Sequence, residues 1–244
     1  MQQKIFKFFL IFLLIFIFSF FIFPQISYLY FSKNQACFFW NKDISNFEKD
    51  QMEFFSESEK FFDKNKTEKI KTSQSDFLEI KLKNKKIEIR KDDKVIWETH
   101  EDWRVEDFIF ADSANKGENY LNLLVWKTGS YGPQKPTWIE KNDFNIRNHL
   151  FIFKINNFAI EPVWQSSALP KPNCEIVIAD VNNDQENELI VLEGDYNNQK
   201  CQGQYVAVWK WHEWGFQNEW RSEKGNYENL RIKFFDQKNY IVVN

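Results

Sequence analysis

Hydrophobic and polar residues alternate in short runs over the C-terminal two-thirds of the chain, from about residue 77 onward. Apolar runs of this length, separated by polar turns, are typical of β-strands in an all-β domain. The runs recur in one order that is recognisable three times. In each copy a strand ends in tryptophan, a second apolar strand ends in aspartate, and another apolar strand follows. The markers are Trp97 and Asp112, Trp164 and Asp180, and Trp220 and Asp236.

A fourth strand precedes each tryptophan and begins near Ile87, Leu150 and Tyr205. The pattern therefore predicts about three four-stranded repeats, each with the size and content of a β-propeller blade. One such sheet cannot bury both of its faces, so neighbouring sheets are expected to pack on one another. The expected fold class is all-β and β-propeller-like, with the repeat domain over residues 77–244.

Three units are fewer than the four to eight blades of most propellers, which leaves the closure of the ring open. The strands that contain Ile87 and Trp97 could pair with the last two strands of the chain. Residues 77–82 and the segment before them could instead add strands. An open stack of sheets, or closure through a second chain, would also agree with the pattern.

The N-terminal segment predicts a membrane partner. Residues 8–23 form an apolar run that only Ser19 interrupts, and Lys4 and Lys7 precede it. No small-residue cleavage site follows, so we expect residues 1–31 to be an uncleaved transmembrane signal anchor that contacts the membrane through residues 4–31. The flanking lysines predict a cytoplasmic N-terminus and an extracytoplasmic C-terminal domain at the cell membrane. The alternative is a cleaved signal peptide and a secreted protein.

Residues 32–76 are rich in charged and polar residues and are interpreted as a spacer. Phenylalanines in this segment recur at steps of seven and eight residues, which predicts a helix over about 45–63. Such a helix could dock on its own domain, on the membrane surface or on a partner. The phenylalanines are Phe47, Phe54, Phe55, Phe61 and Phe62.

Composition narrows the classes of function. The chain has 32 Lys and Arg against 35 Asp and Glu, a net charge of -3, so no basic surface for nucleic acid is expected. Its three histidines are isolated, and neither the H-E-x-x-H zinc motif nor the G-x-S-x-G nucleophile motif occurs. We therefore do not expect an enzyme.

One loop carries the oxygen donors of a cation site. In the stretch that begins at Asp180, side-chain oxygens recur at Asn182, Asp184 and Glu188, and a backbone carbonyl near Glu186 could add a further ligand. Calcium accepts six to eight oxygen ligands in flexible geometry, whereas zinc prefers the His and Cys that this loop lacks. The loop therefore predicts Ca²⁺ as a structural cofactor. An Asn/Asp-rich hairpin turn without metal is the alternative.

The stretch IADVNNDQENELIVLEG resembles the FG-GAP or VCBS repeat of integrin-like β-propellers. The calcium loop of that family reads D-x-[DN]-x-D-G-x-x-[DE]-L, and the four ligand positions match those named above. Gln185 stands where the family has glycine. The loop after Asp112 has the same length but lacks the ligands, and the loop after Asp236 is too short to enclose an ion. The resemblance implies a blade-like fold that serves mainly in recognition.

Two further features predict contacts. Cys174 and Cys201 lie at neighbouring ends of two adjoining strands, so a disulfide is expected outside the cell, with three thiols as the alternative. The long loop from residue 126 to residue 138 could bind a sugar or peptide, or it could fold under its own tryptophan. Its candidate contact residues are Trp126, Tyr131, Lys135 and Trp138.

Together these features predict a membrane-anchored extracytoplasmic β-repeat module with a structural calcium loop, which recognises an unknown surface ligand, either glycan or protein. One alternative is a glycan-active hydrolase that uses carboxylates at the centre of a propeller. Another is a scaffold subunit of an envelope complex, with the spacer helix as its docking element.

Overall fold

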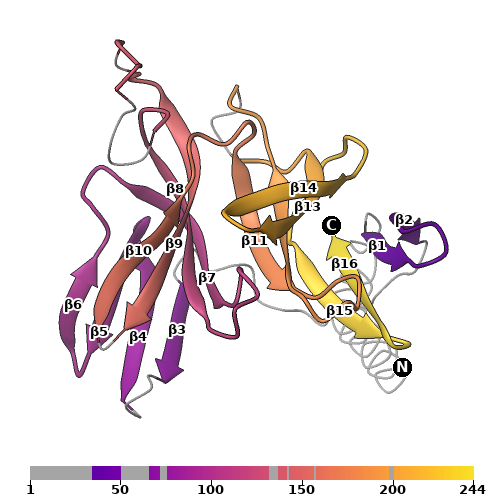
Figure 1. Cartoon of the computed structure of the whole chain (residues 1–244), viewed down its shortest axis with the longest axis horizontal. Helices are drawn as coiled ribbons and strands as arrows, with labels where there is room; N and C mark the ends of the chain where they lie inside the picture. Colours follow the sequence, from indigo (N-terminus) through magenta and orange to yellow (C-terminus); the bar gives the residue numbers. More distant parts are fainter. Residues whose placement is uncertain are drawn as a thin grey trace, which may run out of the picture.

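The computed structural model describes residues 35–50, 66–71, 76–131, 137–141, 143–156, 158–197 and 201–244. All regular secondary structure in these ranges is β-strand, which confirms the all-β fold class (Figure 1). The strands form four antiparallel sheets of four strands each. No segment within these ranges forms an apolar helix of membrane-spanning length. The predicted anchor, residues 1–31, lies outside the described residues.

Three of the sheets are built from consecutive strands. Sheet I contains β3 (Lys66–Lys71), β4 (Phe77–Lys83), β5 (Lys86–Lys91) and β6 (Lys94–Glu98). Sheet II contains β7 (Arg104–Ala111), β8 (Tyr120–Thr128), β9 (Ile146–Asn156) and β10 (Ala159–Gln165). Sheet III contains β11 (Asn173–Ala179), β12 (Glu188–Glu193), β13 (Tyr205–His212) and β14 (Gly215–Arg221).

Sheet IV joins strands from opposite ends of the chain. It contains β15 (Arg231–Phe235), β16 (Lys238–Val243), β1 (Ala36–Asn41) and β2 (Asn46–Asp50), in that order. Strand β1 pairs antiparallel with β16, so that Ala36 lies opposite Val243 and Phe39 lies opposite Tyr240. The strands of Ile87 and Trp97, proposed above as one way to complete the last unit, instead belong to sheet I.

The number and the boundaries of the sheets differ from the predicted repeat units. Each unit was predicted to contain a tryptophan strand followed by an aspartate strand, but a sheet ends between these two strands. Trp97 lies in β6, the last strand of sheet I, whereas Asp112 follows β7, the first strand of sheet II. Sequence similarity reveals the period of a repeat but not the strand at which a sheet begins. Strands β1, β2, β3 and β4, outside the recognised copies, raise the number of sheets to four.

The predicted helix over about 45–63 is wrong for its first residues. Asn46–Asp50 form strand β2, and the Phe47 side chain is buried against Trp40 and Trp220, with ring centroids 5.1 Å away in both pairs. Residues 51–65 lie outside the described residues. The segment 32–76, interpreted as a spacer, therefore contributes strands β1, β2 and β3 to the sheets.

The sheets pack face to face in a row. One buried cluster joins sheets I and II around Phe108, a second joins sheets II and III around Leu124, and a third joins sheets III and IV around Ile190. Sheets I and IV lie at opposite sides of the molecule in Figure 1. No buried cluster among the described residues joins these two sheets.

The chemistry of sheet I agrees with its place at one end of the row. Alternate side chains of β4 and β5, such as Ile80 and Ile89, are fully buried against sheet II. The residues between them, including Glu79, Lys81 and Glu88, lie on the opposite face of the sheet. Burying such charged groups without partners is costly, so this face is suited to solvent rather than to a further sheet.

Polar links connect the first strands of successive sheets. Lys66 of β3 donates a hydrogen bond to the Asp107 carboxylate of β7 at 3.1 Å. The Asp107 carboxylate also accepts a hydrogen bond from the backbone of Ile176 in β11. Glu175 of β11 accepts from the backbone N–H of Leu230, at 2.7 Å, directly before β15. Each sheet is therefore tied to the next by a charged side chain as well as by apolar packing.

Candidate cation-binding loop

The loop from Asp180 to Asn187 connects β11 and β12 at one end of sheet III. Hydrogen bonds to the neighbouring sheets II and IV hold this loop in place. Asn187 donates its side-chain N–H to the carbonyl oxygen of Asp112 at 2.9 Å, and Asn115 accepts the Asn187 backbone N–H at 2.6 Å. Asn239 at the start of β16 donates to the carbonyl oxygen of Asp180 at 2.7 Å. The loop thus braces the ends of sheets II, III and IV.

Within the loop, acidic and amide side chains accept the backbone N–H groups. The Asp180 carboxylate accepts from Asp184 at 3.2 Å and from Gln185 at 2.9 Å. Asn182 Oδ1 accepts from the backbone of Asp184, and Asp184 Oδ1 accepts from that of Glu186, both at 2.9 Å. These bonds satisfy donors that the turn would otherwise leave without partners.

The loop after Asp112 in sheet II has the same backbone design. The Asp112 carboxylate accepts the N–H groups four and five residues later, at 3.1 and 2.6 Å, as Asp180 does. Positive φ angles also fall at equivalent places, at Asn115 and Gly117 in one loop and at Asn183 and Gln185 in the other. Gln185 therefore occupies, with a φ of 73°, the left-handed conformation that Gly117 adopts at 74°. For a residue with a Cβ this conformation costs roughly 1 kcal/mol.

The buried side chain of Glu188, at the start of β12, forms hydrogen bonds with the loop from its inner side. Its side chain is only 2% exposed, and its Oε2 accepts the backbone N–H of Val181 at 2.9 Å. Its Oε1 lies 3.2 Å from the Asn182 amide nitrogen, which donates to it. Burial raises the pKa of Glu188 to about 7, and the nearby Asp184 carboxylate acts in the same direction.

The cation beside these oxygens is Lys210. This residue lies in β13 directly opposite Glu188. Its Nζ is bonded to the Asp184 carboxylate, lies 2.8 Å from Glu186 Oε2 and lies 3.7 Å from Glu188 Oε1. Burial lowers the pKa of Lys210, but its hydrogen bonds to Asp184 and Glu186 outweigh that effect, so the pKa lies above its ordinary value. The ammonium group is therefore charged at neutral pH.

The positions of the carboxylates and of Lys210 decide whether a calcium ion fits in this loop. The carboxylates are suitable donors, but three of them already surround an ammonium group, and a second cation at that place would be repelled. Among the residues that the structure describes, no three His, Cys, Asp or Glu side chains are arranged to hold a metal ion. With Lys210 in place the residues do not fit an additional ion, although the sequence motif alone predicts calcium.

Sequence reasoning missed Lys210 because it lies in a different strand from the loop motif. Only the register of β12 against β13, which sets Glu188 opposite Lys210, brings the two together. A lysine within an otherwise apolar and aromatic strand, Tyr205–His212, was the available signal.

The described residues of the predicted ligand-binding loop differ in their surroundings. Trp126 is buried, packs edge-on against Tyr196 and has the Arg104 guanidinium 5.3 Å from its ring centroid. Tyr131 accepts a hydrogen bond from Lys127 through its carbonyl oxygen. Trp138 is 79% exposed. Lys135 lies outside the described residues.

The cysteines are placed as follows. Cys174 and Cys201 form a disulfide across 5.2 Å between their Cα atoms, the pair that the sequence predicts. It ties the start of β11 to the segment before β13. Cys37 is buried in sheet IV, and burial raises the pKa of its thiol to about 11.

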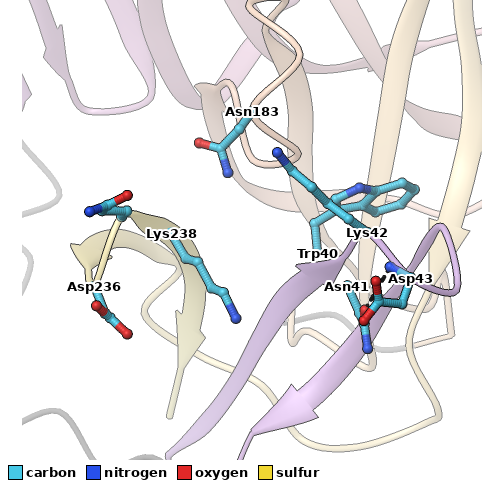
Figure 2. A pocket seen from close by; sticks show the side chains of 8 residues that line it. Trp40, Asn41, Lys42, Asp43, Asn183, Asp236 and Lys238 are labelled. Carbon is cyan, nitrogen blue, oxygen red and sulfur yellow. Dashed lines mark hydrogen bonds between the residues drawn. The ribbon is translucent and has the colours of Figure 1, made fainter.

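A pocket of about 460 Å³ lies beside the candidate loop. In Figure 2 Asn183 of the loop overhangs a space into which Lys238 extends from the start of β16. Trp40 and Lys42, from the hairpin of β1 and β2, line another side. The full lining is Trp40, Asn41, Lys42, Asp43, Asn183, Asp236, Gln237 and Lys238. Sequence reasoning missed this pocket because its walls come from both ends of the chain.

Comparison with family models and with curated proteins identified no relative of this chain. The resemblance to FG-GAP or VCBS repeats therefore rests on the motif around Asp180 and on the geometry described above.

Proposed function

We propose that the chain is a membrane-anchored, extracytoplasmic recognition module built from FG-GAP-like, blade-like sheets, with the Asp180–Asn187 loop as a structural brace. The observation that carries this proposal is the equivalence of the loops that follow Asp112 and Asp180. They share the same capping bonds and the same positive φ positions on equivalent hairpins. That equivalence supports a tandem repeat of the type that the motif resembles.

Exposed aromatic side chains support recognition as the role of this scaffold. Trp138 and Trp214 are each 79% exposed, and both lie outside the strands, on connections at the ends of rigid sheets. Loops on rigid scaffolds often carry binding residues, and tryptophan is enriched in protein interfaces. A glycan or a surface protein is the proposed class of ligand, because tryptophan can stack on sugar rings as well as pack in protein interfaces.

The hydrolase alternative receives no support from two half-buried carboxylates, Asp107 in β7 and Glu175 in β11. Asp107 and Glu175 have pKa values that burial raises, and the charge of Asp107 raises that of Glu175 further. Both carboxylates, however, accept backbone hydrogen bonds, and Asp107 also contacts Lys66. We therefore interpret the pair as structural.

A binding screen tests the proposed recognition. The full chain, displayed in detergent micelles, is exposed to a glycan array and to a panel of surface proteins. Trp138→Ser and Trp214→Ser are compared with the unmodified chain and with Ile44→Ser, a substitution at another exposed apolar residue. Loss of a ligand in a tryptophan variant but not in the control would support the proposal. Equal binding by all four proteins, or no ligand for the unmodified chain, would contradict it.

The membrane anchor is tested separately. Residues 1–31 are proposed to remain attached, so the chain should stay in the membrane pellet after alkaline extraction. A mature soluble protein that lacks this segment would contradict that part of the proposal.

A further inference from the structure

We infer that Lys210 is the resident cation of the Asp180–Asn187 loop, so that the loop closes without a divalent ion and gains calcium affinity only when this lysine is removed. The inference rests on the structural role proposed for the loop and is independent of the proposed recognition role.

The first support is the position of the ammonium group. Lys210 Nζ contacts Asp184, lies 2.8 Å from Glu186 and lies 3.7 Å from the buried Glu188. The lysine side chain is only 17% exposed, whereas Asp184 and Glu186 are 38% and 54% exposed, so solvent screens these contacts in part. An intramolecular cation therefore stands among the carboxylates that the motif assigns to a metal.

The second support comes from the sister loop in sheet II. Lys154 of β9 contacts Glu118 at 2.5 Å, and Glu118 has the same place in its loop as Glu186. Lys154 also follows Phe153, which pairs with Leu121, much as Lys210 follows Trp209, which pairs with Leu189. This loop has Ala114, Lys116 and Tyr120 at the metal-ligand positions of the motif. A lysine from the third strand of the sheet therefore accompanies the hairpin even where the oxygen ligands are missing.

The third support is the balance of charge. Asp180, Asp184, Glu186 and Glu188 carry four carboxylates, and Lys210 supplies an ammonium group in their midst. Without Lys210, three of these carboxylates lose that partner and repel one another. The same oxygens, which are not arranged around a metal ion in the described structure, are then free to move together around calcium, which prefers oxygen ligands.

The test compares Lys210→Met with the unmodified chain and with Lys154→Met, the matched control in the sister loop. Calcium binding is measured by isothermal titration, and thermal unfolding is followed in EDTA and in about 1 mM calcium. We expect the unmodified chain and Lys154→Met to show no calcium-dependent shift of the melting temperature. Lys210→Met should melt lower in EDTA and regain about 2–4 °C with calcium. Adding Asp184→Ala to Lys210→Met should abolish that gain.

Two results would overturn the inference. The first is calcium binding by the unmodified chain as tight as that by Lys210→Met. The second is a Lys210→Met variant that folds but gains nothing from calcium.

A labelling experiment on the unmodified chain keeps the inference testable if Lys210→Met does not fold. Reductive methylation is followed by mass spectrometry, and the rate at Lys210 is compared with that at the exposed Lys94. We expect Lys210 to react at least about tenfold more slowly, because the carboxylates around it favour the charged amine over the reactive neutral form. Equal rates would show that the ammonium group does not occupy the loop. Neither outcome bears on the binding screen, so failure of this inference is distinguishable from failure of the proposed recognition role.

Discussion

The carboxylate of Glu175 accepts the backbone N–H of Leu230 at 2.7 Å, and this bond crosses from sheet III to the segment that leads into sheet IV. The same carboxylate accepts the N–H of Asn229 at 3.2 Å. One side chain therefore satisfies two donors that have no strand partner. This relationship makes Glu175 a structural residue whose loss affects the packing of two sheets.

Replacing Glu175 by Ala should lower the free energy of unfolding by about 1–3 kcal/mol, because two backbone donors lose their acceptor in a poorly solvated place. Urea denaturation measures the change. Glu161→Ala, at an exposed position of β10, is the control and should change stability by less than about 0.5 kcal/mol. Equal effects of the two substitutions would contradict the role given to Glu175.

The buried His149 should make stability depend on pH. Burial lowers its pKa below the ordinary 6.5, and its ring nitrogens lie 3.1 Å from the carbonyl oxygens of Ser166 and Gly129. The unfolded chain therefore binds a proton first as pH falls. The stabilising contribution is present above pH 6.5 and is lost progressively as pH falls below that value.

Urea denaturation at a series of pH values from 7.5 downward measures this effect for the unmodified chain and for His149→Gln. Asp107, Glu175 and Glu188 have raised pKa values and contribute stability that is lost as pH rises. Those groups are common to both proteins, so the difference between the two slopes isolates His149. An identical pH dependence in the two proteins would contradict the prediction.

The disulfide between Cys174 and Cys201 closes a loop with a sequence separation of 27 residues. Replacing both cysteines by Ser should lower the free energy of unfolding by about 3–4 kcal/mol on the chain-entropy estimate. Denaturant unfolding under non-reducing conditions measures this loss, and peptide mapping without reductant checks the pairing. Addition of reductant should destabilise the unmodified chain but not the double variant.

Gln185→Gly should stabilise the protein, because glycine adopts the positive φ of 73° without the steric cost of a Cβ. The gain is expected to be about 0.5–1 kcal/mol, since glycine also raises the entropy of the unfolded chain. Glu186→Gly is the control, because Glu186 does not have a positive φ and its side chain contacts Lys210. That variant should be destabilised. A loss of stability in Gln185→Gly would show that the Gln185 side chain makes a contribution larger than the strain.

The all-β class and most strands of sheets II and III could be predicted from short apolar runs between polar turns, of which β8 and β12 are clear examples. Strand β3, with the sequence KTEKIK and one buried residue, has too few apolar positions for such a signal. Strand β2 was hidden because the spacing of its one phenylalanine agreed with a helix. In both strands tertiary packing, rather than local pattern, determines the structure.

The candidate loop, too, could be predicted only in part from its local sequence. Its oxygen positions are readable because they lie within nine consecutive residues, and the family motif identifies the strained place of Gln185. The contact with Lys210 depends on strand register, and the pocket at Trp40 depends on the pairing of distant segments. Neither relationship is encoded in a short stretch of sequence.

The pairing of Ala36 with Val243 has a consequence for how the protein is made. Strand β1 can pair with β2 early, but it cannot pair with β16 until the ribosome has released the strand that contains Val243. Sheets I to III contain only strands that follow one another along the chain, so they can assemble while synthesis continues. Sheet IV is therefore expected to be completed last. Until β16 has been synthesised, the hydrophobic side chains of β1 lack that strand and can be bound by chaperones.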